Sequence, residues 1–139
     1  MFVDASAIVA LLSDEPEAGR IAAALGTAEI RMTSPIAVLE AALSLARPDK
    51  FNRPVAEIEP MLLDFLESRD IDIHGLPPPR EATSLALSAA HRYRAGRHGL
   101  NLGDCLHYAC AKFHHIPILA TAGEFSQTDL ETVASAADP

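Results

Sequence analysis

The chain has 139 residues, which suits one domain over residues 1–139, and no apolar run approaches the roughly 20 residues that cross a bilayer. Apolar residues make up 49% of it and charged residues 22%, as in ordinary globular proteins. The net charge of −8 argues against a broad surface that coats nucleic acid, but it allows a small site that binds phosphate through a divalent ion, and it suggests a cationic partner.

Apolar periodicity and turn residues predict alternating strands and helices. In order these are a strand over residues 1–4, a helix to Leu12, a helix that opens at 14–17 and stops at Gly26, a strand over 29–32, a helix over 36–46, a loop over 47–54, a helix ending near Arg69, a strand over 71–74, a helix over 80–93, a helix over 101–115 and a strand over 117–121, with Val133 a candidate for an edge strand. This order indicates an α/β domain with a mostly parallel sheet and helices on both faces.

The first strand ends at Asp4. In a parallel sheet that is buried on both faces, the carboxyl ends of the strands point to the crevice where ligands bind. Asp4 is therefore a candidate site residue, although it can equally serve as the N-cap of the following helix. Glu124 follows the last strand, where it is either a further acid at the same edge or a plain loop residue.

The helix over residues 36–46 contains only two polar side chains, Glu40 and Ser44, four residues apart on one face. A helix that is apolar nearly all round is expected to be buried. A buried, ionised carboxylate without a partner loses its hydration at a large cost in free energy. Unless Glu40 lies on the surface, it must be neutral or contact a cation, and a metal ion is the simplest such cation.

The helix over residues 101–115 opens with a pattern typical of a capped helix. Asn101 is a good N-cap, and Asp104 stands three residues later, where an acid reaches back to the cap. Asp104 either only completes this cap or joins Asp4 and Glu40 in a common site.

The most basic segment, residues 91–99, leads directly into this helix. Its arginines Arg92, Arg94 and Arg97 either complement the dipole at the end of the preceding helix or contact phosphate, because the forked guanidinium donors of arginine suit phosphate oxygens.

Carboxylates gathered at one edge of the sheet, without a cysteine or an evident histidine among them, would form a hard oxygen site. Mg²⁺ suits such a site better than zinc, and Mn²⁺ is a plausible substitute. The ion would keep several waters and take substrate phosphate as a further ligand, and a pair of ions would activate water and stabilise the leaving oxygen. The pattern therefore favours hydrolysis of a phosphodiester bond, with the acids as metal ligands.

The two cysteines, Cys105 and Cys110, lie five residues apart on one predicted helix and are poorly placed to bridge each other. They indicate small buried side chains in a reducing compartment. No basic region followed by an apolar segment opens the chain, so we expect no signal peptide. The expected location is the cytoplasm.

Four stretches of this sequence are similar to those of a known family. They are FVDASA at residues 2–7, Glu40 within its apolar helix, LNLGDC at 100–105 before Tyr108-Ala109, and PILATAGEFSQTDL at 117–130. They resemble the PIN-domain ribonucleases and, within these, the VapC toxins of bacterial toxin–antitoxin modules. The resemblance implies a three-layer α/β/α sandwich with a mostly parallel sheet of four or five strands, and a Mg²⁺-dependent endoribonuclease.

The resemblance also implies roles for particular residues. Asp4, Glu40 and Asp104 match the acidic positions of the family, with Asp4 and Asp104 the more direct metal ligands. Supporting roles fall to Ser6, whose hydroxyl would hydrogen-bond the acids, and to Asn101 and Thr121. The implied partners are RNA, a second copy of the chain in a homodimer, and a VapB-type antitoxin whose tail would place a basic side chain against the acids.

One departure from the family concerns Glu124. The family commonly has aspartates just before the phenylalanine that matches Phe125, whereas Gly123 and Glu124 stand there in this chain. Glu124 would reach the ion through water, so the number of metal ions stays open. This departure also favours the alternative of a PIN-like module that binds RNA or protein without cutting. A phosphotransferase of the haloacid-dehalogenase type would need a second aspartate where Ser6 stands.

Overall fold

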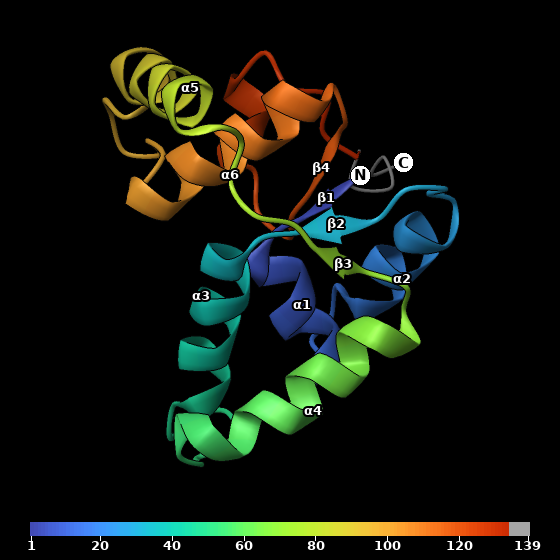
Figure 1. Cartoon of the computed structure of the whole chain (residues 1–139). Helices are drawn as coiled ribbons and strands as arrows, with labels where there is room; N and C mark the ends of the chain where they lie inside the picture. Colours follow the sequence, from blue (N-terminus) through green and yellow to red (C-terminus); the bar gives the residue numbers. More distant parts are fainter. Residues whose placement is uncertain (134–139) are drawn as a thin grey trace.

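The computed structural model describes residues 1–133, in which four parallel strands lie between two groups of helices (Figure 1). The strands are β1 (Phe2–Val3), β2 (Met32–Thr33), β3 (Asp72–Ile73) and β4 (Ile118–Leu119), and their order in the sheet is β3-β2-β1-β4. The helices are α1 (Ala5–Leu12), α2 (Ala18–Gly26), α3 (Pro35–Ala46), α4 (Val55–Ser68), α5 (Pro79–Tyr93), α6 (Leu102–His114) and the short 3₁₀ helix η1 (Glu124–Gln127).

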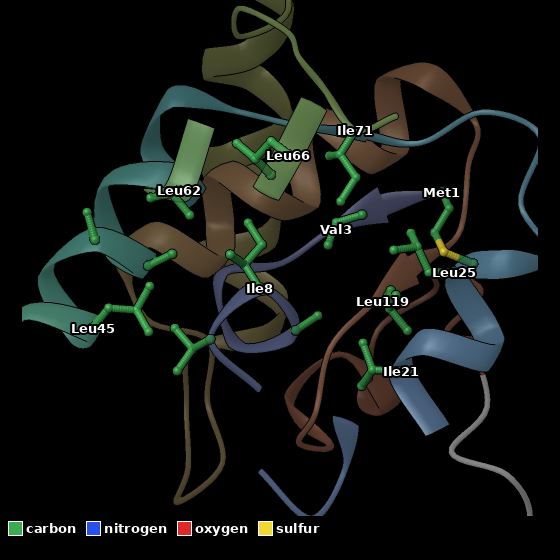
Figure 2. Packing of buried hydrophobic residues seen from close by; sticks show 14 of the residues in the cluster. Met1, Val3, Ile8, Ile21, Leu25, Leu45, Leu62, Leu66, Ile71 and Leu119 are labelled. Carbon is green, nitrogen blue, oxygen red and sulfur yellow. The ribbon is translucent and has the colours of Figure 1, made fainter. Parts of the chain in front are cut away.

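The adjacent strands β1 and β4 send alternate side chains to opposite faces of the sheet, as the pleat of a strand requires. Phe2 of β1 and Ile118 of β4 pack in one core with α5 and α6. Val3 and Leu119 pack in a second core with α1, α2, α3 and α4, and Figure 2 shows both of them among the side chains of this core. The predicted α/β class with helices on both faces is therefore confirmed, and the sheet is parallel throughout.

Most helices lie close to their predicted bounds, but two elements begin later than expected. The second strand starts at Met32 rather than at Glu29, and Ile30 is exposed. Its pairing is set by the neighbouring strand, since the Thr33 hydroxyl donates to the Val3 carbonyl at 2.8 Å. The helix expected to open at residues 14–17 begins at Ala18 instead, because the chain turns before it.

The prediction that the helix around Glu40 is buried nearly all round was wrong. In α3 the side chains of Leu39 and Leu43 are 55% and 52% exposed, while Ala41 and Leu45 face the core. Although nearly all of its residues are apolar, α3 buries one face and exposes the other. Burial of the helix therefore does not by itself require Glu40 to contact a cation.

The expected edge pairing near Val133 exists as an isolated parallel bridge between Ile118 and Thr132. Cys105 and Cys110 are buried and unbridged, as expected. Within residues 1–133, none of the helices combines the length and the apolar character that crossing a membrane requires.

Candidate metal and catalytic site

The four acids singled out in the sequence line one cavity of about 420 Å³ at the carboxyl ends of β1 and β4. These acids are Asp4, Glu40, Asp104 and Glu124. The three residues assigned supporting roles, Ser6, Asn101 and Thr121, line the same cavity. Segments that are distant in the sequence thus converge at the edge of the sheet where α/β proteins bind ligands.

Asp4 is fixed by a chain of hydrogen bonds that begins on β4. The backbone N–H of Thr121 donates to Ser6 Oγ at 3.1 Å, and Ser6 Oγ donates in turn to Asp4 Oδ2 at 2.6 Å. The Ser6 backbone N–H also donates to Asp4 Oδ2, at 3.1 Å, which makes Asp4 the N-cap of α1. Asp4 therefore caps a helix and lines the cavity at once, with Oδ2 committed to Ser6.

Asp104 also serves two purposes. It forms a capping box with Asn101: the Asn101 N–H donates to Asp104 Oδ2 at 3.0 Å, and the Asp104 N–H donates to Asn101 Oδ1 at 2.8 Å. Burial raises the pKa of Asp104 to about 6, and the charges of Asp4 and Glu124 add to this, against the opposing Asn101 N–H and His107. The raised pKa thus reflects first the partial burial of Asp104 and then its proximity to the other acids.

His107 is the member of the site that sequence reasoning missed. It is 1% exposed, its Nε2 contacts Glu40 Oε1, and the same nitrogen lies 3.6 Å from Asp4 Oδ1. The expectation of a site without histidine was therefore wrong. The sequence could have indicated His107 through its spacing, because it follows Asp104 by three residues and so lies on the same face of the helix.

Burial alone would lower the pKa of His107, but the hydrogen bond with Glu40 and the nearby carboxylates outweigh it, so the pKa is raised above its ordinary value. The partner of Glu40 is thus His107, a side chain of the protein that can carry a positive charge. Its carboxylate also lies against the backbone of Gly103, where a Cβ atom would stand 2.7 Å from both of its oxygens.

The donor atoms suit a divalent cation. Asp4, Asp104 and His107 each offer one ligand atom, and these atoms all lie within 4.8 Å of one another. Glu40 and Glu124 line the cavity outside this compact group. The carboxylate oxygens match the preference of Mg²⁺ and Mn²⁺, and the mutual repulsion of the acids is what a bound divalent ion would relieve.

The predicted basic residues lie elsewhere. In the described part of the chain, none of Arg92, Arg94 and Arg97 lines the cavity. Arg92 Nη1 lies 3.6 Å from Asp129 Oδ2, and Arg94 Nε donates to the Leu100 carbonyl at 3.1 Å.

Two cations that the sequence analysis placed in a plain loop do line the cavity, namely Arg47 and Lys50. Each is paired with an acid: Arg47 with Asp49 at 2.6 Å, and Lys50 with Glu15 at 2.6 Å. The spacing could have indicated Arg47, which is the C-cap of α3 and follows Glu40 by seven residues, or about two helical turns.

Comparison with known proteins identifies the family. The PIN domain family model matches residues 1–129. VapC ribonuclease Mb0640 of Mycobacterium bovis is 36% identical over 136 residues, which cover 96% of this chain and 98% of that protein.

Two solved structures share the fold. The crystal structure of Mycobacterium tuberculosis VapC20, described as a sarcin-ricin loop cleaving toxin, has a TM-score of 0.73 at 17% identity and covers 95% of this chain and 97% of its own. A toxin–antitoxin complex from Klebsiella pneumoniae has a TM-score of 0.63 at 17% identity, with 92% of each chain covered. The chain belongs to the PIN domain family and, within it, to the VapC group.

Proposed function

We propose that this protein is a Mg²⁺-dependent endoribonuclease that hydrolyses RNA phosphodiester bonds with metal-activated water, as the toxin of a toxin–antitoxin pair. The observation that carries the proposal is the convergence of Asp4 and Asp104 in one cavity, each with one carboxylate oxygen already engaged by the protein. The name of the Mycobacterium bovis relative, a VapC ribonuclease, supports the same activity.

In this proposal Asp4 and Asp104 hold the ion, with Mn²⁺ as a substitute for Mg²⁺. The bound ion supplies Lewis acidity and lowers the pKa of a coordinated water. Ser6 fixes Oδ2 of Asp4 and Asn101 fixes Oδ2 of Asp104, so that Oδ1 of each carboxylate is left for the ion. Preorganised ligands of this kind need no rearrangement when the ion arrives.

Glu40 and Glu124 are proposed to contact the ion through water, because they line the cavity outside the compact donor group. Their negative charge would strengthen the attraction of the cavity for a divalent cation. Arg92, Arg94 and Arg97 remain proposed RNA contacts outside the cavity.

The proposed partners follow from charge and exposure. Six acids line the cavity against two cations, which suits the basic tail of a VapB-type antitoxin; they are Asp4, Glu15, Glu40, Asp49, Asp104 and Glu124 against Arg47 and Lys50. The Klebsiella pneumoniae complex shows the fold in a toxin–antitoxin assembly.

We also propose one PIN domain over residues 1–139 and a cytoplasmic location. We further propose a homodimer whose interface covers the exposed side chains of Leu39 and Leu43, and sedimentation of the purified protein tests it.

The deciding experiment is cleavage of total cellular RNA by purified protein in Mg²⁺, in EDTA and after Asp4→Asn. We expect cleavage by the wild type in Mg²⁺ only, and a loss on the order of 100-fold or more in Asp4→Asn, since removal of outer partners of a metal site already costs about 10- to 100-fold. Asp64→Asn, an exposed aspartate on α4, is the matched control and should cut normally.

Wild-type protein that is folded and binds Mg²⁺ but cuts no RNA would contradict the proposal. It would favour instead a PIN-like module that binds RNA or protein without cutting.

A further inference from the structure

We propose that His107 is a positioning residue: its Nε2–H holds the carboxylate of Glu40, and His107 is not a ligand of the metal ion, although its Nε2 lies close to the donor atoms of Asp4 and Asp104. The inference rests on the proposed function, because it concerns the same metal site. It assigns the buried histidine a role opposite to the one that proximity alone suggests.

The first observation is the other ring nitrogen of His107. The side chain is 1% exposed, and among residues 1–133 no hydrogen-bond partner lies near Nδ1, which is buried. The ring packs against Phe2, with ring centroids 5.6 Å apart. Nδ1 therefore faces an apolar environment.

These surroundings determine which ring nitrogen of His107 can carry the hydrogen. A histidine that binds a metal through Nε2 must carry its hydrogen on Nδ1, and ligating histidines almost always donate that N–H to a carbonyl, carboxylate or water. In His107 that N–H would point into the core without an acceptor, which is costly. If the hydrogen is on Nε2 instead, Nδ1 carries only a lone pair without a donor. The Nε2–H then faces the carboxylates of Glu40 and Asp4.

The cationic imidazole leads to the same result, because both of its nitrogens carry hydrogen. In the neutral ring with its hydrogen on Nε2, and equally in the cationic ring, Nε2 is a donor and has no lone pair to offer a metal. Its acceptor is Glu40, whose Oε1 it contacts.

The third observation is that α6 constrains Glu40 from a second side. The carboxylate lies against the backbone of Gly103, one helical turn before His107, at a distance that leaves no room for a Cβ atom. The hydrogen bond from His107 and the notch at Gly103 together set the direction of a side chain that is otherwise one-third exposed. The same helix turn carries Asp104, so α6 aligns Glu40 with the ligand.

The direct test is the position of the imidazole hydrogen, measured by NMR on protein with ¹⁵N-labelled histidine in EDTA and in saturating Mg²⁺. The His107 signal is assigned by its loss in His107→Gln. We expect Nε2 to carry hydrogen in both conditions. A ring with hydrogen on Nδ1 only in the presence of Mg²⁺ would overturn the proposal. The measurement requires no RNA cleavage, so its failure is distinct from a failure of the proposed function.

A pair of variants tests the role of the N–H. Glutamine can place an N–H near the position of Nε2, whereas leucine cannot. We expect His107→Leu to lower kcat by about 10- to 100-fold, and His107→Gln to restore most of the loss. Equal losses in the two variants would overturn the positioning role.

The ratio of Co²⁺ to Mg²⁺ affinity, measured by calorimetry, separates positioning from ligation, because an imidazole ligand favours Co²⁺ while carboxylates suit Mg²⁺. We expect the ratio to be the same in wild type, His107→Gln and His107→Leu. A fall of about tenfold or more in both variants would identify His107 as a ligand. Since the NMR measurement uses wild-type protein, the proposal stays testable even if a variant does not fold.

Discussion

The carboxylate of Glu40 occupies the space that a side chain at residue 103 would need. A Cβ atom at Gly103 would stand 2.7 Å from Oε1 and 2.7 Å from Oε2 of Glu40, closer than any real contact. Gly103 is the second residue of α6 and does not have a positive φ, so its backbone does not require glycine. The glycine in the LNLGDC motif is therefore explained by the approach of Glu40.

Gly103→Ala should lower RNA cleavage without destabilising the fold. Alanine favours a helix by about 1 kcal/mol over glycine, while its methyl group would displace the Glu40 carboxylate from His107. Cleavage rates and thermal midpoints measure the two effects. Gly19→Ala is the matched control, since Gly19 is the second residue of α2 and has nothing within 4 Å of an added Cβ. Unchanged cleavage in Gly103→Ala would show that the position of Glu40 does not matter.

Asp104 should make the protein less stable as pH rises, when no metal is present. Its folded pKa is about 6 against 3.8 in the unfolded chain. Between these values the folded state binds the extra proton, so the free energy of unfolding falls as pH rises from about 4 to about 6 and stays low above that. Urea unfolding in EDTA across this range measures the slope.

Asp104→Asn should remove that slope, because the amide does not ionise but can still accept the Asn101 N–H. At pH 7 in EDTA we expect the variant to be at least as stable as the wild type, and to cut no RNA in Mg²⁺. The difference in stability should vanish near pH 4. A large loss of stability in Asp104→Asn would instead assign Asp104 to the helix cap alone.

Arg97 should contribute to RNA binding through charge alone. The side chain is exposed, whereas Arg94 is tied to the Leu100 carbonyl. In an Asp4→Asn background, where RNA is not cut, Arg97→Gln should weaken binding and reduce the salt slope by about 1, as expected for one lost phosphate contact. Arg94→Gln should in addition lower the thermal midpoint. Arg80→Gln, an exposed arginine at the start of α5, serves as the control, and equal slopes in all variants would remove this segment from the RNA contacts.

Asp129 should stabilise the segment that carries Glu124. Its carboxylate accepts hydrogen bonds from Lys112 Nζ and Tyr108 Oη, both at 2.7 Å, and these bonds, the one from Lys112 foremost, hold its pKa at about 2. Asp129→Asn should cost about 1 kcal/mol at neutral pH, a small value because the pair is partly exposed. Because the folded pKa is depressed, this contribution is present above about pH 4 and is lost as pH falls towards 2. A difference that does not change with pH in urea unfolding would contradict the ionic origin.

The positions of Asp4 and Asp104 could be predicted because local rules determine them. A short apolar strand followed by an acid, and an Asn-to-Asp spacing of three at a helix start, each fix the direction of one carboxylate without knowledge of the rest of the fold. The α/β order follows in the same way from periodicity. The second strand was misplaced because its pairing depends on β1, and the exposed Leu39 shows that composition does not determine which face of a helix is covered.

The partner of Glu40 could not be predicted, because it depends on how α3 packs against α6. The sequence shows that Glu40 needs compensation, but an imidazole and a metal ion satisfy that need equally well until the packing is known. The same holds for Arg47 and Lys50, whose access to the cavity depends on how the chain turns after α3.

Because Phe2 and Val3 pack into opposite cores, the length of the chain before Asp4 cannot change freely. Inserting or deleting one residue between Met1 and Asp4 would exchange the two faces and send the acid away from its cavity. The number of residues before Asp4 is therefore fixed by the need to place its carboxylate in the cavity.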